Sequence, residues 1–312
     1  MSKKITTIGG QALMEGIMMV GPKRTMAAFC DEQGNISTEE ITTPRLTQSH
    51  PILGKPFLRG IFALIDSFRL GYKALSLSAD KLTQGEEEEE LTGIDKWLSD
   101  HLGEKMTEVI MTVASILGVA LAVVLFFFLP TVLFNLLESA VPGNIAGWRS
   151  LFEGVIRVGL FVAYVGLIGQ VPDIKRTFQY HGAEHKTIFC YENDLPLTVE
   201  NVRIQGRFHP RCGTSFLILM LVLGIIVGFF IPFSNPFLRT FTKILCIPVI
   251  MNVGYELQKA CARHDNWLSR AITAPGLWMQ RITVKEPDDK MIEAAIAAME
   301  AVIPENGEDL IR

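Results

Sequence analysis

The stretch IMTVASILGVALAVVLFFFLPTVLFN, from Ile110 to Asn135, carries no charged side chain. A helix needs about 20 apolar residues to cross the hydrocarbon core of a bilayer, so this stretch is long enough to span a membrane. Pro130 can kink the helix near its far end. The sequence therefore predicts a transmembrane helix here, and with it a membrane protein.

Three further apolar stretches follow towards the C-terminus: Leu151–Gln170, Ser215–Phe233 and Leu238–Leu257. The first carries Glu153 and Arg157 at i,i+4 spacing, where they can pair or reach the headgroups. The last is the weakest, because Lys243 and Glu256 flank a shorter apolar run, and a buried or interfacial helix is its alternative. We expect an α-helical multi-pass membrane protein with about four transmembrane helices.

Composition agrees with a membrane part joined to soluble segments. Of the 312 residues, 49% are hydrophobic and 20% are charged, and the formal net charge of -4 gives no support for nucleic-acid binding. The five cysteines are scattered without a CxxC pair, so neither a disulfide framework nor a zinc ribbon is indicated. Two lysines at the N-terminus have no apolar run behind them, unlike a signal peptide.

The distribution of Lys and Arg predicts the orientation. The apolar stretches are joined in pairs by two short connections, and neither connection, 138–147 or 234–236, contains Lys or Arg. Lys and Arg occur instead in the loop 171–214 and in the tail after Leu257; the loop contains Lys175, Arg176, Lys186, Arg203, Arg207 and Arg211. By the positive-inside rule, the loop, the tail and both termini are expected to be cytoplasmic.

The soluble segments are expected to form a small cytoplasmic α+β part built from the N-terminal segment, the central loop and the C-terminal tail. In it, Thr25–Cys30 and Asn35–Ile41 are predicted to form a hairpin. Leu58–Leu77 is amphipathic at helical period and either lies on the membrane surface or packs on the strands. A terminal helix is expected over Glu286–Met299, with Pro287 in its first turn.

The predicted organisation has six parts along the chain. These are the N-terminal strands and amphipathic helix (1–85), an acidic linker (86–108), transmembrane helices one and two (109–170), the cytoplasmic His/Cys-rich loop (171–214), transmembrane helices three and four (215–257), and the C-terminal cytoplasmic tail (258–312).

The strongest chemical pattern lies in the loop, on a helix that Asp173 can cap and that runs towards Cys190. On this helix His181, Glu184 and His185 share one face, in the order H-x-x-E-H. In the inverted zincin arrangement the two imidazoles bind zinc, and the carboxylate activates the water. The alternative is that both histidines simply form hydrogen bonds within a polar loop.

A catalytic zinc takes a third protein ligand and keeps an open position. The candidates for that ligand are His209, Cys212, Glu192 and Glu256. Glu15 and Gln11, in a Gly-bounded N-terminal stretch, are weaker candidates for a supporting role. The expected cofactor is a divalent metal, and zinc is the ion that these ligands favour.

Four motifs in chain order resemble the YqhQ-like family of bacterial membrane proteins. They are GGQALMEGIMMVGP from Gly9, YHGAEHKTIFCYE from Tyr180, HPRCGTSF from His209 and PGLWMQRITVKEPDD from Pro275. The resemblance implies a bacterial inner-membrane protein and a predicted metal-dependent enzyme, but no established substrate. The motif positions that carry the candidate ligands and supports are Gln11, Glu15, His181, Glu184, His185, Glu192, His209 and Cys212.

These observations predict a membrane-embedded, metal-dependent hydrolase at the cytoplasmic face, with Glu184 as general base. Peptides, lipid-linked molecules and small molecules are all compatible substrates. The alternative is a non-catalytic membrane scaffold that docks cytoplasmic partners and holds a structural metal or none. A transporter ranks third, because no inverted repeat is evident in the sequence. The expected partners are the lipid bilayer and an unidentified substrate or protein; the sequence is silent on the oligomeric state.

Overall fold

The computed structural model describes residues 4–31, 33–55, 58–83, 106–264 and 266–310. The chain divides into two compact units, each built from separate segments. The first, called here the sheet unit, comprises Met1–Lys81, Val162–Met220 and Pro248–Arg312; the second, the helical unit, comprises Leu82–Phe161 and Leu221–Ile247. The acidic linker predicted over 86–108 lies mostly outside the described residues.

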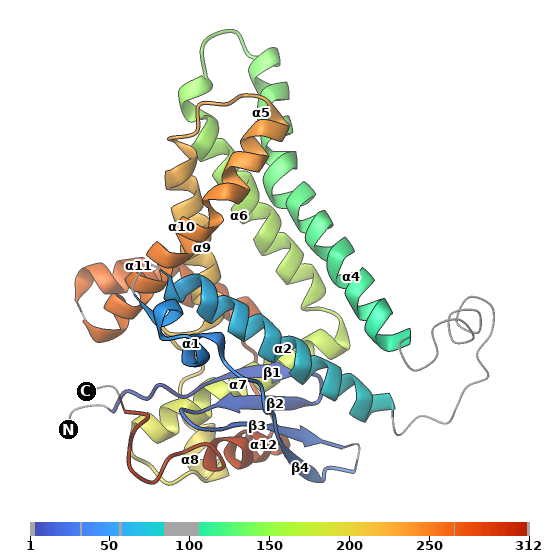
Figure 1. The fold of residues 1–312 in the computed structure, drawn as a ribbon, viewed down its shortest axis with the longest axis vertical. Helices are drawn as coiled ribbons and strands as arrows, with labels where there is room; N and C mark the ends of the chain where they lie inside the picture. The colour runs from blue at the N-terminus through green and yellow to red at the C-terminus, as the bar shows by residue number, and fades with distance from the viewer. Residues whose placement is uncertain (1–3, 32, 56–57, 84–105, 265, 311–312) are drawn as a thin grey trace. The chain divides into compact units, whose positions relative to one another are not determined.

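Within the described residues, one antiparallel sheet forms the centre of the sheet unit (Figure 1). Its strands follow chain order: β1 Gly9–Leu13, β2 Gly16–Val20, β3 Thr25–Cys30 and β4 Ile36–Glu40. The predicted hairpin over β3 and β4 is confirmed, with Cys30 paired to Ile36. The turn is closed by Asp31, whose carboxylate accepts a hydrogen bond from the Asn35 backbone N–H at 2.7 Å.

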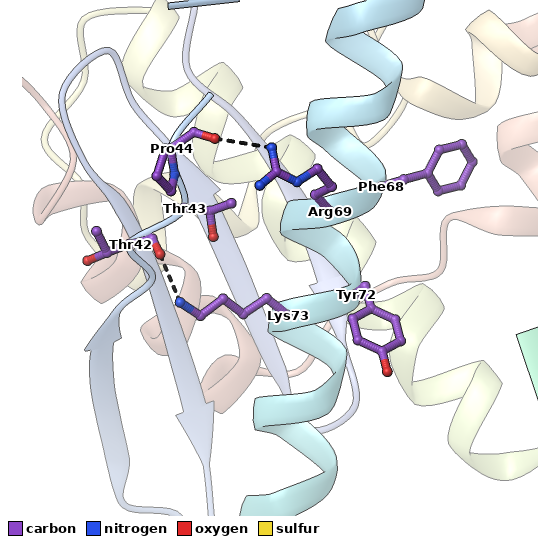
Figure 2. Close-up of a pocket in the computed structure, with 7 residues that line it drawn as sticks. All are labelled: Thr42, Thr43, Pro44, Phe68, Arg69, Tyr72 and Lys73. Atoms are coloured by element: carbon purple, nitrogen blue, oxygen red, sulfur yellow. Dashed lines mark hydrogen bonds between the residues drawn. The ribbon is translucent and has the colours of Figure 1, made fainter. Parts of the chain in front are cut away.

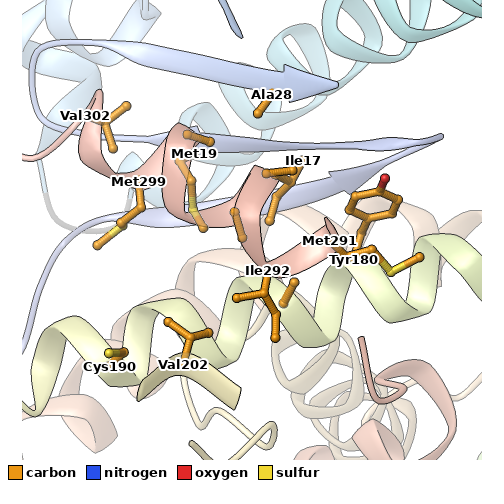
Figure 3. Close-up of a cluster of buried hydrophobic side chains, with 14 of the residues drawn as sticks. Ile17, Met19, Ala28, Tyr180, Cys190, Val202, Met291, Ile292, Met299 and Val302 are labelled. Atoms are coloured by element: carbon orange, nitrogen blue, oxygen red, sulfur yellow. The ribbon is translucent and has the colours of Figure 1, made fainter. Parts of the chain in front are cut away.

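Apolar side chains cover both faces of the sheet, because successive residues of a strand point to opposite sides. Ile17 and Met19 of β2 pack against α7 (Pro172–Glu192) and α12 (Asp289–Glu300), the cluster drawn in Figure 3. Met18, between them, faces the other way, towards α2 (Arg59–Thr83). The sheet unit is therefore three layers: α2, the sheet, and the pair α7 and α12.

Helix α2 packs on the strands, the second of the two placements expected from the sequence. It is also tied to the segment after β4: the Lys73 ammonium donates to the Thr42 carbonyl at 2.8 Å, and Arg69 reaches the Pro44 carbonyl. These residues line a surface hollow of about 580 Å³ (Figure 2). None of the candidate site residues from the sequence lines this hollow.

Two helix starts differ in detail from the prediction. Asp173 does not cap α7; it lies within the first turn, and the cap residue Val171 makes no side-chain bond. At that position its carboxylate still favours the positive end of the helix. Helix α12 begins after Pro287 rather than around it, because Asp288 is the N-cap and accepts from the Met291 N–H at 2.9 Å.

The long apolar helices agree in part with the predicted spans. Among the described residues, three helical stretches are long and apolar enough to cross a membrane: Thr112–Ala140, Ala146–Ile168 and Pro236–Arg263. The first comprises most of α4 (Met106–Val123), a π-helical turn η3 (Val124–Phe128) and α5 (Leu129–Ala140). The predicted third span, Ser215–Phe233, corresponds to α9, a shorter apolar helix over Gly213–Gly228, so the count of four is not confirmed.

The predicted fourth span lies within α10 (Pro236–Arg263), which is longer than its apolar run suggested. The remaining elements are α1 (Leu46–Ser49), η1 (Pro51–Gly54), η4 (Ala146–Trp148), α6 (Arg149–Ile168), α8 (Val199–Arg203) and α11 (Trp267–Thr283). Within the sheet unit, an isolated bridge pairs Thr6 with Leu310 and ties the two terminal segments together.

A candidate His/Cys metal centre

Helix α7 carries the H-x-x-E-H pattern, as predicted, and presents both histidines to one side. The rings of His181 and His185 lie with their centroids 4.4 Å apart. Between them in sequence, Gly182 permits a very close approach of another segment, because a Cβ there would lie 2.0 Å from the Lys285 carbonyl oxygen. The helix is held in this position by the Lys285 N–H, which donates to the Phe178 carbonyl at 2.9 Å.

Backbone carbonyls fix the orientation of both imidazoles. His181 Nδ1 lies 3.1 Å from the Thr283 carbonyl oxygen, and His185 Nδ1 lies 2.6 Å from that of Arg207. A carbonyl oxygen can only accept, so both Nδ1 atoms carry the hydrogen. In a neutral imidazole this leaves the lone pair on Nε2, the form in which histidine binds a metal.

The two Nε2 atoms have different surroundings. His181 Nε2 lies 3.1 Å from the Cys212 sulfur. His185 Nε2 is buried and has no hydrogen-bond partner among the described residues. Unpaired buried polar atoms are uncommon in folded proteins, and a bound ion is one explanation for such an atom.

Cys212 completes the group. It lies just before α9, is buried, and its sulfur accepts a hydrogen bond from the Thr214 N–H at 3.4 Å. Cysteine sulfur is one of the usual protein ligands of zinc. The ligand atoms of His181, His185 and Cys212 all lie within 4.8 Å of one another. Ligand atoms of one tetrahedral zinc lie about 3.5 Å apart, so this group is close to that arrangement.

Glu184 lies on the flank of His181 away from His185. Its carboxylate accepts the Gly10 N–H of β1 at 3.0 Å, and it is not part of the three-residue group. Burial raises the pKa of the Glu184 carboxyl, although the neighbouring His181 and the Gly10 hydrogen bond oppose this effect. Strand β1 therefore holds the carboxylate against the sheet, one helical turn from the first histidine.

His209 lies next to the group with its nitrogens directed elsewhere. Its ring centroid is 5.5 Å from that of His185, yet its Nε2 lies 3.6 Å from the Glu192 carboxylate and its Nδ1 accepts from the Arg211 N–H. Burial lowers the pKa of His209 to about 4, and the nearby Arg211 cation adds to the shift. The side chain is therefore neutral at pH 7 and, in this orientation, does not present a lone pair to the group.

Glu192 is the centre of a buried polar network. It is 3% exposed, pairs with the Arg211 guanidinium, and accepts the Thr6 N–H at 3.0 Å. Burial alone would raise the pKa of the Glu192 carboxyl, but the His209 contact, the Arg211 charge and the Thr6 N–H together lower it. Glu192 thus connects the end of α7 to the N-terminal segment rather than to the metal-ligand group.

Replacing Glu192 with glutamine is expected to destabilise the sheet unit by about 3 kcal/mol at pH 7, because Arg211 loses its buried counter-charge. The folded-state pKa of Glu192 is lowered, so its contribution to stability is complete above the unfolded-state pKa and is lost as the pH falls through the folded-state value. Denaturant unfolding at pH 7 and pH 4 measures both effects. The gap between wild type and variant should shrink at pH 4; an equal gap would contradict this ionic role.

A cavity of about 380 Å³ opens beside His209 within the sheet unit. Arg211, Gln258 and Ser269 give it polar walls, while Phe189 and Leu277 give it apolar ones. Gln258 also reaches towards the Cys212 carbonyl at 3.5 Å, which connects the cavity wall to the ligand group. A ligand with both polar and apolar parts fits these walls.

The remaining candidates from the sequence lie apart from the three-residue group. Glu15 occupies the tight turn between β1 and β2, with φ of 48°, and its carboxylate pairs with Arg176. Gln11 lies on the α2 side of the sheet, beside Gly71. Glu256 on α10 forms an ion pair with Arg59, its Oε1 lying 2.6 Å from Nε.

Sequence reasoning missed Gln280, which is fully buried on α11. Its Oε1 accepts the His209 N–H at 2.7 Å, and its Nε2 donates to the His209 carbonyl at 2.7 Å and to the Ser215 hydroxyl. This side chain fixes the loop that carries His209 and Cys212. A signal was present, since Gln280 belongs to the PGLWMQRITVKEPDD motif, but its partners were not deducible from the sequence.

Comparison with known proteins identifies relatives along nearly the whole chain. The family described as "Protein of unknown function (DUF1385)" matches residues 55–305. The uncharacterized protein YqhQ of Bacillus subtilis (strain 168) is 32% identical over 304 residues, which cover 95% of this chain and 92% of that protein. No solved structure matches the chain.

Proposed function

The chain belongs to the DUF1385 family, together with the YqhQ protein, and from the geometry of its own His/Cys group we propose that it is a metal-dependent hydrolase embedded in the bacterial inner membrane. The observation that carries the proposal is the buried His185 Nε2, which has no partner among the described residues. His181 and Cys212 each offer a further ligand atom, and the three atoms lie within 4.8 Å of one another. A divalent ion, zinc by preference, satisfies all three at once.

The residues present fit such an ion. His181 and His185 have their Nδ1 hydrogens bonded to carbonyl oxygens, which is the usual outer support of a zinc-binding imidazole. Cys212 would supply its sulfur as the third ligand atom. Three protein ligands leave a tetrahedral ion one further position, and a catalytic zinc keeps that position for water or substrate.

The location favours a substrate at the membrane surface. The long apolar helices support insertion in a bilayer, and the Lys and Arg residues of the loop 171–214 support a cytoplasmic position for the site. The cavity beside His209 has polar and apolar walls, which suits an amphipathic substrate such as a lipid-linked ester or a peptide from a membrane protein. When bound, the ion would act as a Lewis acid and lower the pKa of water.

In this proposal Glu184 takes the proton from water, as its place in the H-x-x-E-H order suggests. It is next to His185 in sequence and is held in position by the Gly10 N–H. His209 and Gln258 would contact substrate from the cavity wall. Arg211 and Glu192 keep the His209 loop in place and do not touch the reacting atoms.

Glu184→Gln is expected to keep the metal and to lower turnover by about 10²–10⁴-fold, because a general base contributes about that much. The measurement pairs metal content with metal-dependent hydrolysis of a panel of fluorogenic amides and esters by the detergent-purified protein. Glu15→Gln is the matched control, since that carboxylate pairs with Arg176 outside the group. If the Glu184 variant turned over as fast as wild type, the general-base role would be wrong.

One observation favours a second candidate, a non-catalytic scaffold with a structural metal. The Glu184 carboxylate is held by β1 rather than standing within the three-residue group. Cobalt substitution separates the two functions, because a small hydroxamate changes the visible spectrum of Co²⁺ only if a coordination position is open. A spectrum that hydroxamate leaves unchanged would favour the scaffold.

A further inference from the structure

The helical unit contains a second cluster of charged side chains, far in sequence from the His/Cys group. Glu153 on α6 accepts from Arg239 Nε at 2.9 Å and from Lys243 Nζ at 2.5 Å, both on α10. Arg157 lies one helical turn after Glu153 on α6. All four side chains are buried, and most of their neighbours along α6 and along the first half of α10 are apolar.

The charges in this cluster do not balance. Three basic residues meet a single carboxylate, which leaves two uncompensated positive charges among the described residues. The nearby acid Glu138 does not supply the difference, because it pairs with Arg149 at 2.6 Å. Uncompensated charge is costly in an apolar surrounding, so a buried excess of this kind calls for an anion.

Arg157 shows where the missing partner belongs. Its Nε donates to the Phe126 carbonyl at 2.6 Å, in the π-helical turn η3, and its guanidinium lies 5.1 Å from the centre of the Phe127 ring. Its Nη2, however, is buried without a hydrogen-bond partner among the described residues. The side chain is 4% exposed, so bulk water does not satisfy this donor.

Space is left beside this guanidinium. A Cβ added at Gly224 on α9 would meet no atom within 4 Å except Arg157 Nη1, at 3.7 Å. Arg239, by contrast, is saturated: its Nη atoms donate to the carbonyls of Ile231 and Gly228 and to the Ser150 hydroxyl. The unpartnered donor, Nη2, and the open space beside Nη1 therefore belong to the same guanidinium.

We infer that this cluster binds a phosphate group, either free in solution or at the head of a membrane lipid. Guanidinium and ammonium groups are the usual protein donors to phosphate oxygens, and a phosphate monoester carries about -1.5 to -2 charges at neutral pH, which matches the excess. The inference is independent of the metal proposal, because none of its residues belongs to the sheet unit.

Thermal unfolding of the full-length protein in detergent, followed by tryptophan fluorescence, tests for free phosphate. Inorganic phosphate is titrated into potassium gluconate at constant ionic strength. The unfolding midpoint should rise saturably, by about 4 °C, and Arg157→Gln should abolish the rise. Arg149→Gln is the matched control: it removes a buried arginine from the same helix, but one already paired, and should keep the response.

Native mass spectrometry of the delipidated protein tests for the lipid source. Retention of a phospholipid by wild type, lost in Arg157→Gln, would assign the phosphate to a lipid even where inorganic phosphate has no effect. If Arg157→Gln does not fold, Gly224→Leu fills the space beside the guanidinium while keeping every charge. The inference would be overturned if wild type showed neither a phosphate-dependent midpoint nor a retained phospholipid. Equal responses in wild type and Arg157→Gln would overturn it as well.

Discussion

Replacing His185 with alanine is expected to lower the zinc content of the purified protein from about one ion per chain to nearly none. The reason is geometric: His185 supplies the one buried ligand atom of the group that has no other partner among the described residues. Elemental mass spectrometry of protein purified in detergent without chelators measures the change. The double variant His181→Ala/His185→Ala should give the same result, since two of three ligands are then gone.

The sharpest control is His209→Gln, because His209 is a buried histidine whose ring lies 5.5 Å from that of His185. Its nitrogens face Glu192 and Arg211, so this variant is expected to keep the ion. Loss of zinc from a folded His209→Gln protein would show that His209 rotates to become a fourth ligand, which would make the site closed and structural. Wild-type protein without any divalent ion would remove the basis of the metal proposal.

Local patterns predicted the individual elements well. The uncharged stretch from Ile110 forms one long helical run, and the β3–β4 hairpin forms where turn residues separate two short predicted strands. Helix ends were less accurate, as at Pro287, because several polar residues nearby could each act as the cap. The predicted third span proved short because α9 ends at Gly228, four residues before Pro232.

The layered arrangement of the sheet unit could not be read from such patterns. The Gly10 N–H meets Glu184 across 174 positions of sequence, and Thr6 bonds to Asp309 across 303. Such contacts depend on how complete elements pack, which periodicity within one segment does not encode. The sequence left open whether the motifs spread along the chain converge, and the structure packs the first two of them together around α7.

At the candidate site, helical spacing alone predicted that His181 and His185 face one way. Cys212 entered as one of several third ligands, and the structure brings it to His181 at 3.1 Å. The carbonyls that orient both rings had no signal in the sequence, because any residue offers a carbonyl. Gln11 was a candidate support for the site, but strand alternation directs its side chain to the α2 face of the sheet. The preceding residue, Gly10, is the one whose N–H bonds to Glu184.

Gly182→Ala should be among the most destabilising single-methyl additions in the sheet unit. The new Cβ would lie 2.0 Å from the Lys285 carbonyl oxygen and 3.2 Å from Pro287 Cδ. The closest atom belongs to backbone, so relief requires the 284–287 segment to move away from α7, at a cost of about 3 kcal/mol. Alanine's better helix propensity returns only about 1 kcal/mol.

Gly166→Ala is the matched control for this substitution, because it also lies in a helix of the same unit and a Cβ there would meet nothing within 4 Å. It should leave stability unchanged or slightly higher, whereas Gly182→Ala should lower the unfolding midpoint. The same displacement would move the Thr283 carbonyl that orients His181, so zinc affinity should fall together with stability. If Gly182→Ala bound zinc and unfolded as wild type does, the close crossing of α7 and the 284–287 segment would not exist in the protein, and the orientation assigned to His181 would lose its support.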